Sequence, residues 1–308
     1  MCKTCGCGEE GESKIVNLQT GAEFDLKNAH ADGGHARSHS HGVARPHTHP
    51  HAHEHGHDHD HGHDHDHAHD GAERTLDVQA RILAKNDAIA ERNRAWLAGR
   101  EIFAVNLVSA PGAGKTTLVE RTIRALKDKV ALYVIEGDQA TSIDGERIRA
   151  AGAPAVQVNT GAGCHLDAEM VARGLAELRP SPGSIVLIEN VGNLVCPALF
   201  ALGEGAKAVI LSVTEGDDKP LKYPHMFRAA QLVAVSKIDL APYVDFDRNR
   251  ALENARRINP AIEAVEVAAT TGEGFEAWVD WLLNAAAAMR EDAFALSDRA
   301  AFSITSRA

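Results

Sequence analysis

The spacing of apolar residues divides the chain into segments with different predicted structures. Between residues 71 and 100, apolar positions recur every seventh residue at Leu76, Leu83 and Ala90, which is typical of an amphipathic lead-in helix packed by one face. Between residues 101 and 292, short apolar runs alternate with helical stretches. This alternation predicts an α/β fold, a three-layer domain whose mainly parallel sheet is covered by helices on both faces.

The pattern also bounds the individual elements, and it leaves residues 293–308 as a tail without a predicted element. Ligands are expected at the carboxyl ends of the strands. The predicted strands are Phe103–Val108, Val130–Ile135, Ala155–Val158, Ser184–Ile188, Ala208–Val213, Leu232–Val235 and Ala264–Ala268. The predicted helices are Lys115–Lys127, Asp144–Ala150, Asp167–Leu178, Tyr223–Ala230, Asp247–Arg257 and Gly274–Met289.

Residues 1–70 differ in composition from the rest of the chain. They hold most of the histidines and few large apolar side chains. A segment of this kind cannot bury enough apolar surface to offset the entropy lost when its backbone becomes ordered. We therefore expect residues 1–70 to contribute nothing to a core and to form a disordered, Cys/His-rich extension that binds metal ions.

Charge and composition exclude several classes of protein. The net charge of −11 argues against nucleic acid as a partner. No apolar run approaches the ~18 residues of a membrane-spanning helix, and the first residues lack the apolar core of a signal peptide. We therefore expect a cytoplasmic protein without membrane contact. Cysteines stay reduced in that compartment, so the five in this chain are expected to be metal ligands or plain thiols.

A glycine-rich stretch from Ser109 to Thr117 joins a predicted strand to a predicted helix. This arrangement binds nucleotide phosphates, because backbone N–H groups of the loop and of the helix N-terminus point at phosphate oxygens. Lys115 would reach the β- and γ-phosphates, and the Thr116 hydroxyl would bind Mg²⁺. Ser109 replaces the first glycine of the usual pattern. The predicted phosphate-binding residues are Gly112, Ala113, Gly114, Lys115, Thr116 and Thr117.

Other strand ends offer the remaining parts of a nucleotide site. Asp138 follows the second strand, and Glu189 ends a later strand in an E-x-x-G sequence that resembles the D-x-x-G switch of GTPases. Either carboxylate could hold Mg²⁺ or orient the attacking water, and the Gly192 amide could bond the γ-phosphate and move when it leaves. The catalytic residues are therefore predicted to be Lys115, Asp138 and Glu189. The magnesium ligands would be Thr116 and the same two carboxylates.

The sequence from Ser236 to Asp239 is close to the N-K-x-D guanine reader. Asp239 could accept two hydrogen bonds from guanine, and the stem of Lys237 would pack over the base. Because serine replaces asparagine at Ser236, one supporting hydrogen bond of that pattern is not assured. With the phosphate loop and the switch, these residues predict a P-loop GTPase. The switch has no glutamine and no arginine finger is evident, so we expect slow turnover.

Two segments near the N-terminus carry metal-ligating side chains. Cys2, Cys5 and Cys7 can close around one cation, and three sulfurs with one nitrogen would suit Ni²⁺. From His47 to His69 every second residue is histidine, most often with aspartate between. Imidazole favours nickel, zinc and copper, so we expect a loose site for storage or buffering. A solvated low-complexity spacer is the alternative.

The remaining cysteines lie near the predicted switch. Cys164 and His165 follow a predicted strand, and Cys196 comes four residues after Gly192. Two thiolates and one imidazole leave an open position on a tetrahedral ion, or share the ion across a two-fold dimer. Two buried structural cysteines are the alternative. The sequence thus favours a second metal site that touches the switch.

Taken together, these motifs resemble the HypB family, the nickel-incorporation GTPases of nickel-iron hydrogenase maturation. The resemblance covers nearly the whole chain. It rests on the N-terminal thiols, the histidine tract and three segments of the domain. Those segments are residues 109–117, 189–197 and 214–224.

The resemblance implies a GTPase of the SIMIBI class that uses GTP and Mg²⁺, dimerises with GTP and delivers nickel to the hydrogenase large-subunit precursor. The implied partner is the small metallochaperone HypA. The family's N-terminal nickel site falls on Cys2, Cys5 and Cys7, and its nickel or zinc site in the GTPase domain falls on Cys164, His165 and Cys196. A metal-storage protein with a regulatory nucleotide domain and a urease-type accessory GTPase are the alternatives.

Overall fold

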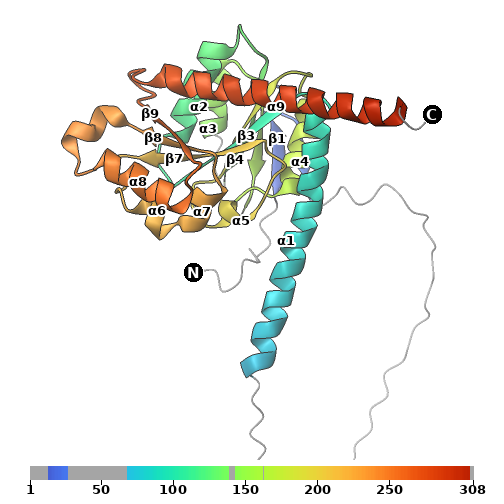
Figure 1. Cartoon of the computed structure of the whole chain (residues 1–308), viewed down its shortest axis with the longest axis horizontal. Helices are drawn as coiled ribbons and strands as arrows, with labels where there is room; N and C mark the ends of the chain where they lie inside the picture. The colour runs from blue at the N-terminus through green and yellow to red at the C-terminus, as the bar shows by residue number, and fades with distance from the viewer. Residues whose placement is uncertain (1–12, 27–67, 139–142, 162, 306–308) are drawn as a thin grey trace, which may run out of the picture.

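The computed structural model describes residues 13–26, 68–138, 143–161 and 163–305 of the chain. These residues form one nine-stranded sheet with helices on both faces (Figure 1). The strands are β1 (Lys14–Asn17), β2 (Glu23–Asp25), β3 (Phe103–Ser109), β4 (Leu132–Asp138), β5 (Ala155–Asn159), β6 (Ile185–Glu189), β7 (Ala206–Ser212), β8 (Leu232–Ser236) and β9 (Glu263–Val267).

The strand order across the sheet is β2-β1-β5-β4-β6-β3-β7-β8-β9. The strands from β3 to β9 pair in parallel, so their carboxyl ends meet at one edge, while β1 is antiparallel to both β2 and β5. The strand that leads into the phosphate loop, β3, lies between β6 and β7. The predicted α/β class is confirmed, and each predicted strand has a counterpart among β3 to β9.

The helices form the two outer layers. The sheet has apolar side chains on both faces because alternate residues of a strand point to opposite sides. On β3, Phe103, Val105 and Leu107 face one helical layer, whereas Ala104 faces the other. Helices α2, α3 and α9 cover the first face, and α1, α4, α5, α7 and α8 cover the second. The helices are α1 (Ala68–Ala98), α2 (Lys115–Leu126), α3 (Ile143–Ala151), α4 (Ala168–Leu178), α5 (Cys196–Leu199), α6 (Lys219–Lys222), α7 (Pro224–Ala229), the 3-10 helix η1 (Ile238–Tyr243), α8 (Arg248–Ile258) and α9 (Phe275–Thr305).

The strand β1 corrects the expectation that residues 1–70 contribute nothing to a core. It pairs with β5, placing Ile15 opposite Val158, and the Ile15 side chain is only 2 % exposed. Four residues with one buried isoleucine give too short an apolar run to stand out in the sequence. β1 takes this place because the edge strand β5 presents backbone N–H and C=O groups that need hydrogen-bond partners.

The two long helices differ in how well they were predicted. Helix α1 agrees with the predicted lead-in helix, and its N-terminal part projects away from the sheet in Figure 1. Helix α9 continues to Thr305, through most of the segment expected to be a tail. Residues 290–305 contain neither glycine nor proline, so nothing in that stretch stops a helix. None of the described helices combines the length and the apolarity needed to cross a bilayer.

Candidate functional site

The loop between β3 and α2 is shaped to receive phosphates. Gly114 precedes α2 with a φ of 97°, in the left-handed region where a side chain would be strained. Lys115 Nζ donates a hydrogen bond to Ser109 Oγ at 2.7 Å, so the residue that replaces the first glycine of the motif positions the lysine. Burial lowers the pKa of Lys115, and an anionic phosphate would offset that desolvation. The loop lines a cavity of about 480 Å³.

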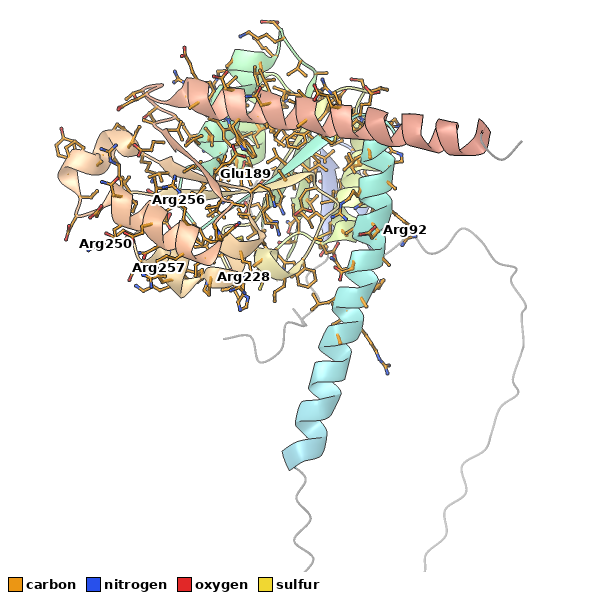
Figure 2. All side chains as sticks on the ribbon, in the orientation of Figure 1. Arg92, Glu189, Arg228, Arg250, Arg256 and Arg257 are labelled. Carbon is orange, nitrogen blue, oxygen red and sulfur yellow. The ribbon has the colours of Figure 1, made fainter. Side chains whose placement is uncertain are left out.

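Two buried glutamates face this loop from adjacent strands. Glu136 on β4 and Glu189 on β6 are register partners and are 2 % and 4 % exposed. Thr116 Oγ1 donates a hydrogen bond to Glu189 Oε1 at 2.6 Å. Oε2 of each glutamate has no hydrogen-bond partner among the described residues. In Figure 2, Glu189 lies within the body of the molecule, in contrast to the exposed Arg256 and Arg257 of α8.

The environment of the two glutamates disfavours their negative charges. Burial, followed by repulsion from Glu189, raises the pKa of Glu136 to about 9. Burial raises the pKa of Glu189 to about 7, although Lys115 and Thr116 oppose the change. A divalent cation would satisfy the orphaned oxygens and neutralise the charges, and Mg²⁺ prefers oxygen ligands. The residues present therefore fit a magnesium ion held by Thr116 and these carboxylates.

The predicted ligand Asp138 also lines the phosphate cavity, where its side chain is half-buried. Asp138 was predicted as a ligand and Glu136 was not, although the two residues lie two positions apart on β4. Side chains at i and i+2 of a strand project to the same face. An acidic pair at that spacing at the end of a strand was therefore the signal that could have identified Glu136.

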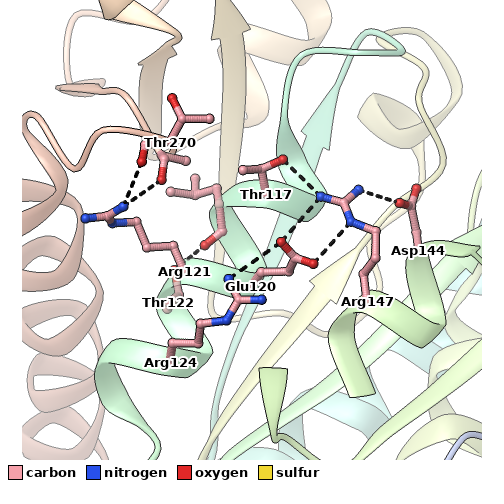
Figure 3. Close-up of polar contacts among 10 residues, drawn as sticks. Thr117, Glu120, Arg121, Thr122, Arg124, Asp144, Arg147 and Thr270 are labelled. Atoms are coloured by element: carbon pink, nitrogen blue, oxygen red, sulfur yellow. Dashed lines mark hydrogen bonds and ion pairs between the residues drawn. The ribbon is translucent and has the colours of Figure 1, made fainter. Parts of the chain in front are cut away.

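Arg147 on α3 is a second residue that the sequence analysis missed. Its guanidinium hydrogen-bonds to Glu120 at 3.1 Å, to Asp144 at 2.8 Å and to Thr117 at 3.2 Å (Figure 3). The same residue lines the phosphate cavity. A cation other than Lys115 therefore borders the space predicted for the phosphates. The signal in the sequence was an arginine one turn into the helix that follows β4.

A second cavity of about 330 Å³ adjoins the loop beside β8 and is lined by the residues predicted to bind the base. Asp239 and Thr270 line it, and Asp239 Oδ2 accepts a hydrogen bond from Thr270 Oγ1 at 3.4 Å. Ser236 Oγ donates a hydrogen bond to the carbonyl of Ala113 at 2.7 Å. The serine thus supports the phosphate loop although it departs from the asparagine of the motif. Lys237 lines both cavities.

Gly192 lies against the phosphate loop. A Cβ atom at this position would lie 3.0 Å from Cα of Pro111, so a side chain here would crowd the backbone of the loop. Gly192 also lines the phosphate cavity, together with Asn190. The segment from Glu189 to Gly192 is therefore in contact with the place where the γ-phosphate is expected.

The structure brings together Cys164, His165 and Cys196, whose role as ligands stays a prediction. Their ligand atoms all lie within 4.8 Å of one another. Cys164 Sγ lies 3.0 Å from Cys196 Sγ and 3.7 Å from His165 Nδ1. Burial lowers the pKa of His165, which favours the neutral imidazole that binds metal ions. Two sulfurs and one nitrogen suit nickel or zinc.

The other predicted metal ligands lie outside the described residues. They are Cys2, Cys5 and Cys7 and almost all of the histidine tract. Their metal binding therefore stays a prediction.

Comparisons with known proteins identify relatives across most of the chain. Residues 103–266 match the CobW/HypB/UreG nucleotide-binding domain. The chain is 48% identical to the hydrogenase maturation factor HypB of Escherichia coli K12, over 92% of this chain and 98% of that protein. It is 55% identical to HypB of Rhizobium leguminosarum bv. viciae, over 70% of this chain and 72% of that protein.

Two solved structures have a similar fold. HypB from Archaeoglobus fulgidus superposes with a TM-score of 0.62 at 41% identity, covering 66% of this chain and 99% of that one. HypB from Helicobacter pylori, solved in complex with nickel, superposes with a TM-score of 0.62 at 36% identity, covering 68% of this chain and 96% of that one.

Proposed function

Because the chain belongs to the HypB family of CobW/HypB/UreG nucleotide-binding proteins, we propose that it hydrolyses GTP and delivers nickel to the large-subunit precursor of a nickel-iron hydrogenase. The observation that carries this proposal is the position of Cys196, four residues after Gly192 of the switch and beside Cys164 and His165. A change at the γ-phosphate can therefore reach a metal site over a short stretch of backbone.

The nucleotide would occupy the two adjoining cavities. Lys115 and the backbone N–H groups of the loop bind the phosphates, and Asp239 accepts hydrogen bonds from guanine. Thr116, Glu136 and Glu189 would hold a magnesium ion, which would supply positive charge for the phosphate oxygens, and Asp138 lines the same cavity. Turnover is slow because the switch has no glutamine to orient the attacking water.

Nickel is the cargo of the reaction. The thiols Cys2, Cys5 and Cys7 and the histidine tract collect it. The cluster of Cys164, His165 and Cys196 holds an ion, nickel or zinc, whose affinity depends on the nucleotide. We propose that GTP favours a homodimer and that a HypA-type metallochaperone accepts nickel before it reaches the hydrogenase precursor.

A pair of variants in the full-length protein tests this function. In Lys115→Ala, GTP hydrolysis and GTP-dependent release of nickel to the metallochaperone should both be lost, while nickel bound by the N-terminal thiols remains. Lys127→Ala is the matched control, because this exposed lysine lies at the other end of α2 and outside the phosphate cavity. Nickel release that is equally fast in Lys115→Ala and in the parent protein contradicts the proposal.

A further inference from the structure

Four buried polar side chains connect the switch segment to the region of the cysteine–histidine cluster. We name these four residues the polar network: Asn190 directly after Glu189, Asn106 on β3, Glu204 two residues before β7, and Lys207 in its second position. Asn190, Asn106 and Lys207 are 1 %, 0 % and 6 % exposed, and the Glu204 side chain is 7 % exposed. Burying such groups costs desolvation that apolar residues would not incur. The network therefore requires an explanation beyond packing.

The first arm of the network holds the loop that carries Cys164 and His165. Asn190 Oδ1 accepts a hydrogen bond at 3.0 Å from the backbone N–H of Leu166, the residue after His165. The Leu166 side chain packs on β4 so closely that a Cβ atom at Gly137 would lie 2.7 Å from it. Leu166 is thus fixed between the switch and the nucleotide-binding end of β4.

The second arm crosses β3 and ends beside the other cysteine. Asn190 Nδ2 donates to Asn106 Oδ1 at 3.2 Å, and Asn106 Nδ2 donates to Glu204 Oε1 at 3.0 Å. Glu204 forms an ion pair with Lys207 at 3.6 Å. The Lys207 ammonium donates a hydrogen bond at 2.7 Å to the carbonyl of Pro197, which directly follows the second cysteine of the cluster.

We propose that the polar network transmits the state of the nucleotide site to the metal cluster, with Asn190 and Lys207 as its positioning residues. This inference rests on the proposed function. Asn190 lies between Glu189 and Gly192, so a movement of the switch displaces both arms. Since one arm holds the Cys164–His165 loop and the other holds the backbone beside Cys196, the displacement changes the separation of the ligands and hence the metal affinity.

Asn106 is the position where the network can be interrupted without touching either site. Asn106→Leu keeps the number and branching of the side-chain heavy atoms and removes the hydrogen bonds to Asn190 and Glu204. Glu204 retains its ion pair with Lys207 and its hydrogen bond from the backbone N–H of Leu202 at 2.6 Å. The substitution therefore leaves no buried charge without a partner.

The quantity to measure is the nickel affinity of the cluster with and without a non-hydrolysable GTP analogue. The protein is the full-length chain with Cys2, Cys5 and Cys7 changed to serine, and the signal is the absorption of nickel bound to thiolate. In this parent we expect the two dissociation constants to differ by about fivefold or more, a usual size for coupling between sites. In Asn106→Leu the difference should fall below about twofold, while GTP still binds and is hydrolysed.

Two further variants separate coupling from a loss of packing. Combining Asn106→Asp with Glu204→Gln exchanges the carboxylate and the amide, so the hydrogen bonds of position 106 to Asn190 and to position 204 regain a donor and an acceptor. Because the ion pair with Lys207 is lost, the coupling should return to above about twofold without reaching the parent value. Thr122→Val removes a different buried hydrogen bond, the one donated by Trp278 Nε1 at 2.9 Å in the layer of α2 and α9. Its coupling should stay at the parent value.

The outcomes distinguish this inference from the function on which it rests. Full coupling in Asn106→Leu overturns the role of the network. If that variant does not fold, Lys207→Met combined with Glu204→Gln cuts the hydrogen bond to Pro197 and is judged by the same criterion. A parent protein that neither hydrolyses GTP nor binds nickel at the cluster refutes the proposed function. A parent that does both but shows no coupling overturns the network and the nucleotide-dependent affinity of the cluster, while GTP hydrolysis and nickel binding stand. Coupling in the parent that persists in Asn106→Leu overturns the network alone.

Discussion

The phosphate cavity contains more carboxylates than cations. Glu136, Asp138, Asp144 and Glu189 line it together with three basic residues. The triphosphate of a nucleotide would add further negative charge. Binding therefore depends on a divalent cation, which agrees with the orphaned oxygens of the two buried glutamates. The basic residues are Lys115, Arg147 and Lys237.

The raised pKa of Glu136 predicts a pH-dependent stability of the metal-free protein. The unfolded chain loses this proton near the ordinary value of 4.5, whereas the folded chain keeps it until the pH nears about 9. Between these values the folded state binds more protons, so the free energy of unfolding falls as the pH rises. In Glu136→Gln this fall should be smaller by about 1 kcal/mol or more between pH 5 and 9.

Urea unfolding in the presence of a chelator measures this difference. Added Mg²⁺ should stabilise the parent protein at pH 8 and should stabilise Glu136→Gln less, because a carboxylate ligand is missing. Identical pH dependence in the two proteins would contradict the position assigned to Glu136.

We expect Arg147 to contribute to GTP hydrolysis, because its side chain lines the phosphate cavity and its guanidinium can stabilise the charge that develops on the phosphates. Arg147→Ala should lower the turnover number for GTP by about tenfold or more. Arg124→Ala is the matched control, because Arg124 pairs with the same Glu120 at 3.9 Å but lies outside the cavity (Figure 3). Single-turnover hydrolysis of GTP measures both. Equal losses in the two variants would assign the effect to Glu120 and α2, not to the phosphates.

At the scale of elements, the position of β1 leads to a prediction about stability. Residues 1–70 contain few large apolar side chains, yet Ile15 among them should stabilise the fold. Ile15→Ala should lower the free energy of unfolding by about 2 kcal/mol or more, because the removed side chain is buried against the sheet. Phe24→Ala on β2 is the control, since its side chain is 46 % exposed and its loss should cost less than about 0.5 kcal/mol. Denaturant titration of both variants measures the difference. An Ile15→Ala variant with an unchanged free energy of unfolding would mean that β1 does not support the fold.

The elements show what the sequence can and cannot predict. Strands such as β6 were predicted because their buried residues form nearly continuous apolar runs, as in Ile185–Glu189. The strand β1 was not, because its place depends on the open edge of β5 and not on its own residues. In the site, the loop residues follow from a local motif. The pairing of Glu136 with Glu189 and the partners of Arg147 depend on which strands and helices become neighbours, and spacing along the chain does not contain that information.

At the scale of the whole molecule, parallel pairing explains why the proposed nucleotide site and the cysteine–histidine cluster adjoin. The loops after β3, β4, β6 and β8 leave the same edge of the sheet, and the loop after β5 carries Cys164 to that edge. Cys196 arrives there with the segment after β6. The polar network crosses beneath them on β3. Coupling between the two sites therefore needs no movement of whole domains, only a change at the ends of the strands.

The same architecture predicts that the N-terminal region has two separable roles. Replacing residues 27–67 by a glycine–serine segment of equal length should reduce the number of nickel ions bound, because most histidines are removed, and should leave unfolding and GTP hydrolysis unchanged. Deleting residues 1–70 should in addition lower the stability, because it removes β1 with Ile15 and exposes the edge of β5. Equilibrium dialysis with Ni²⁺ and urea unfolding of the two proteins measure the two roles. Equal stability of both proteins would contradict a structural role for β1, whereas a loss of stability on deletion alone assigns β1 to the nucleotide-binding domain.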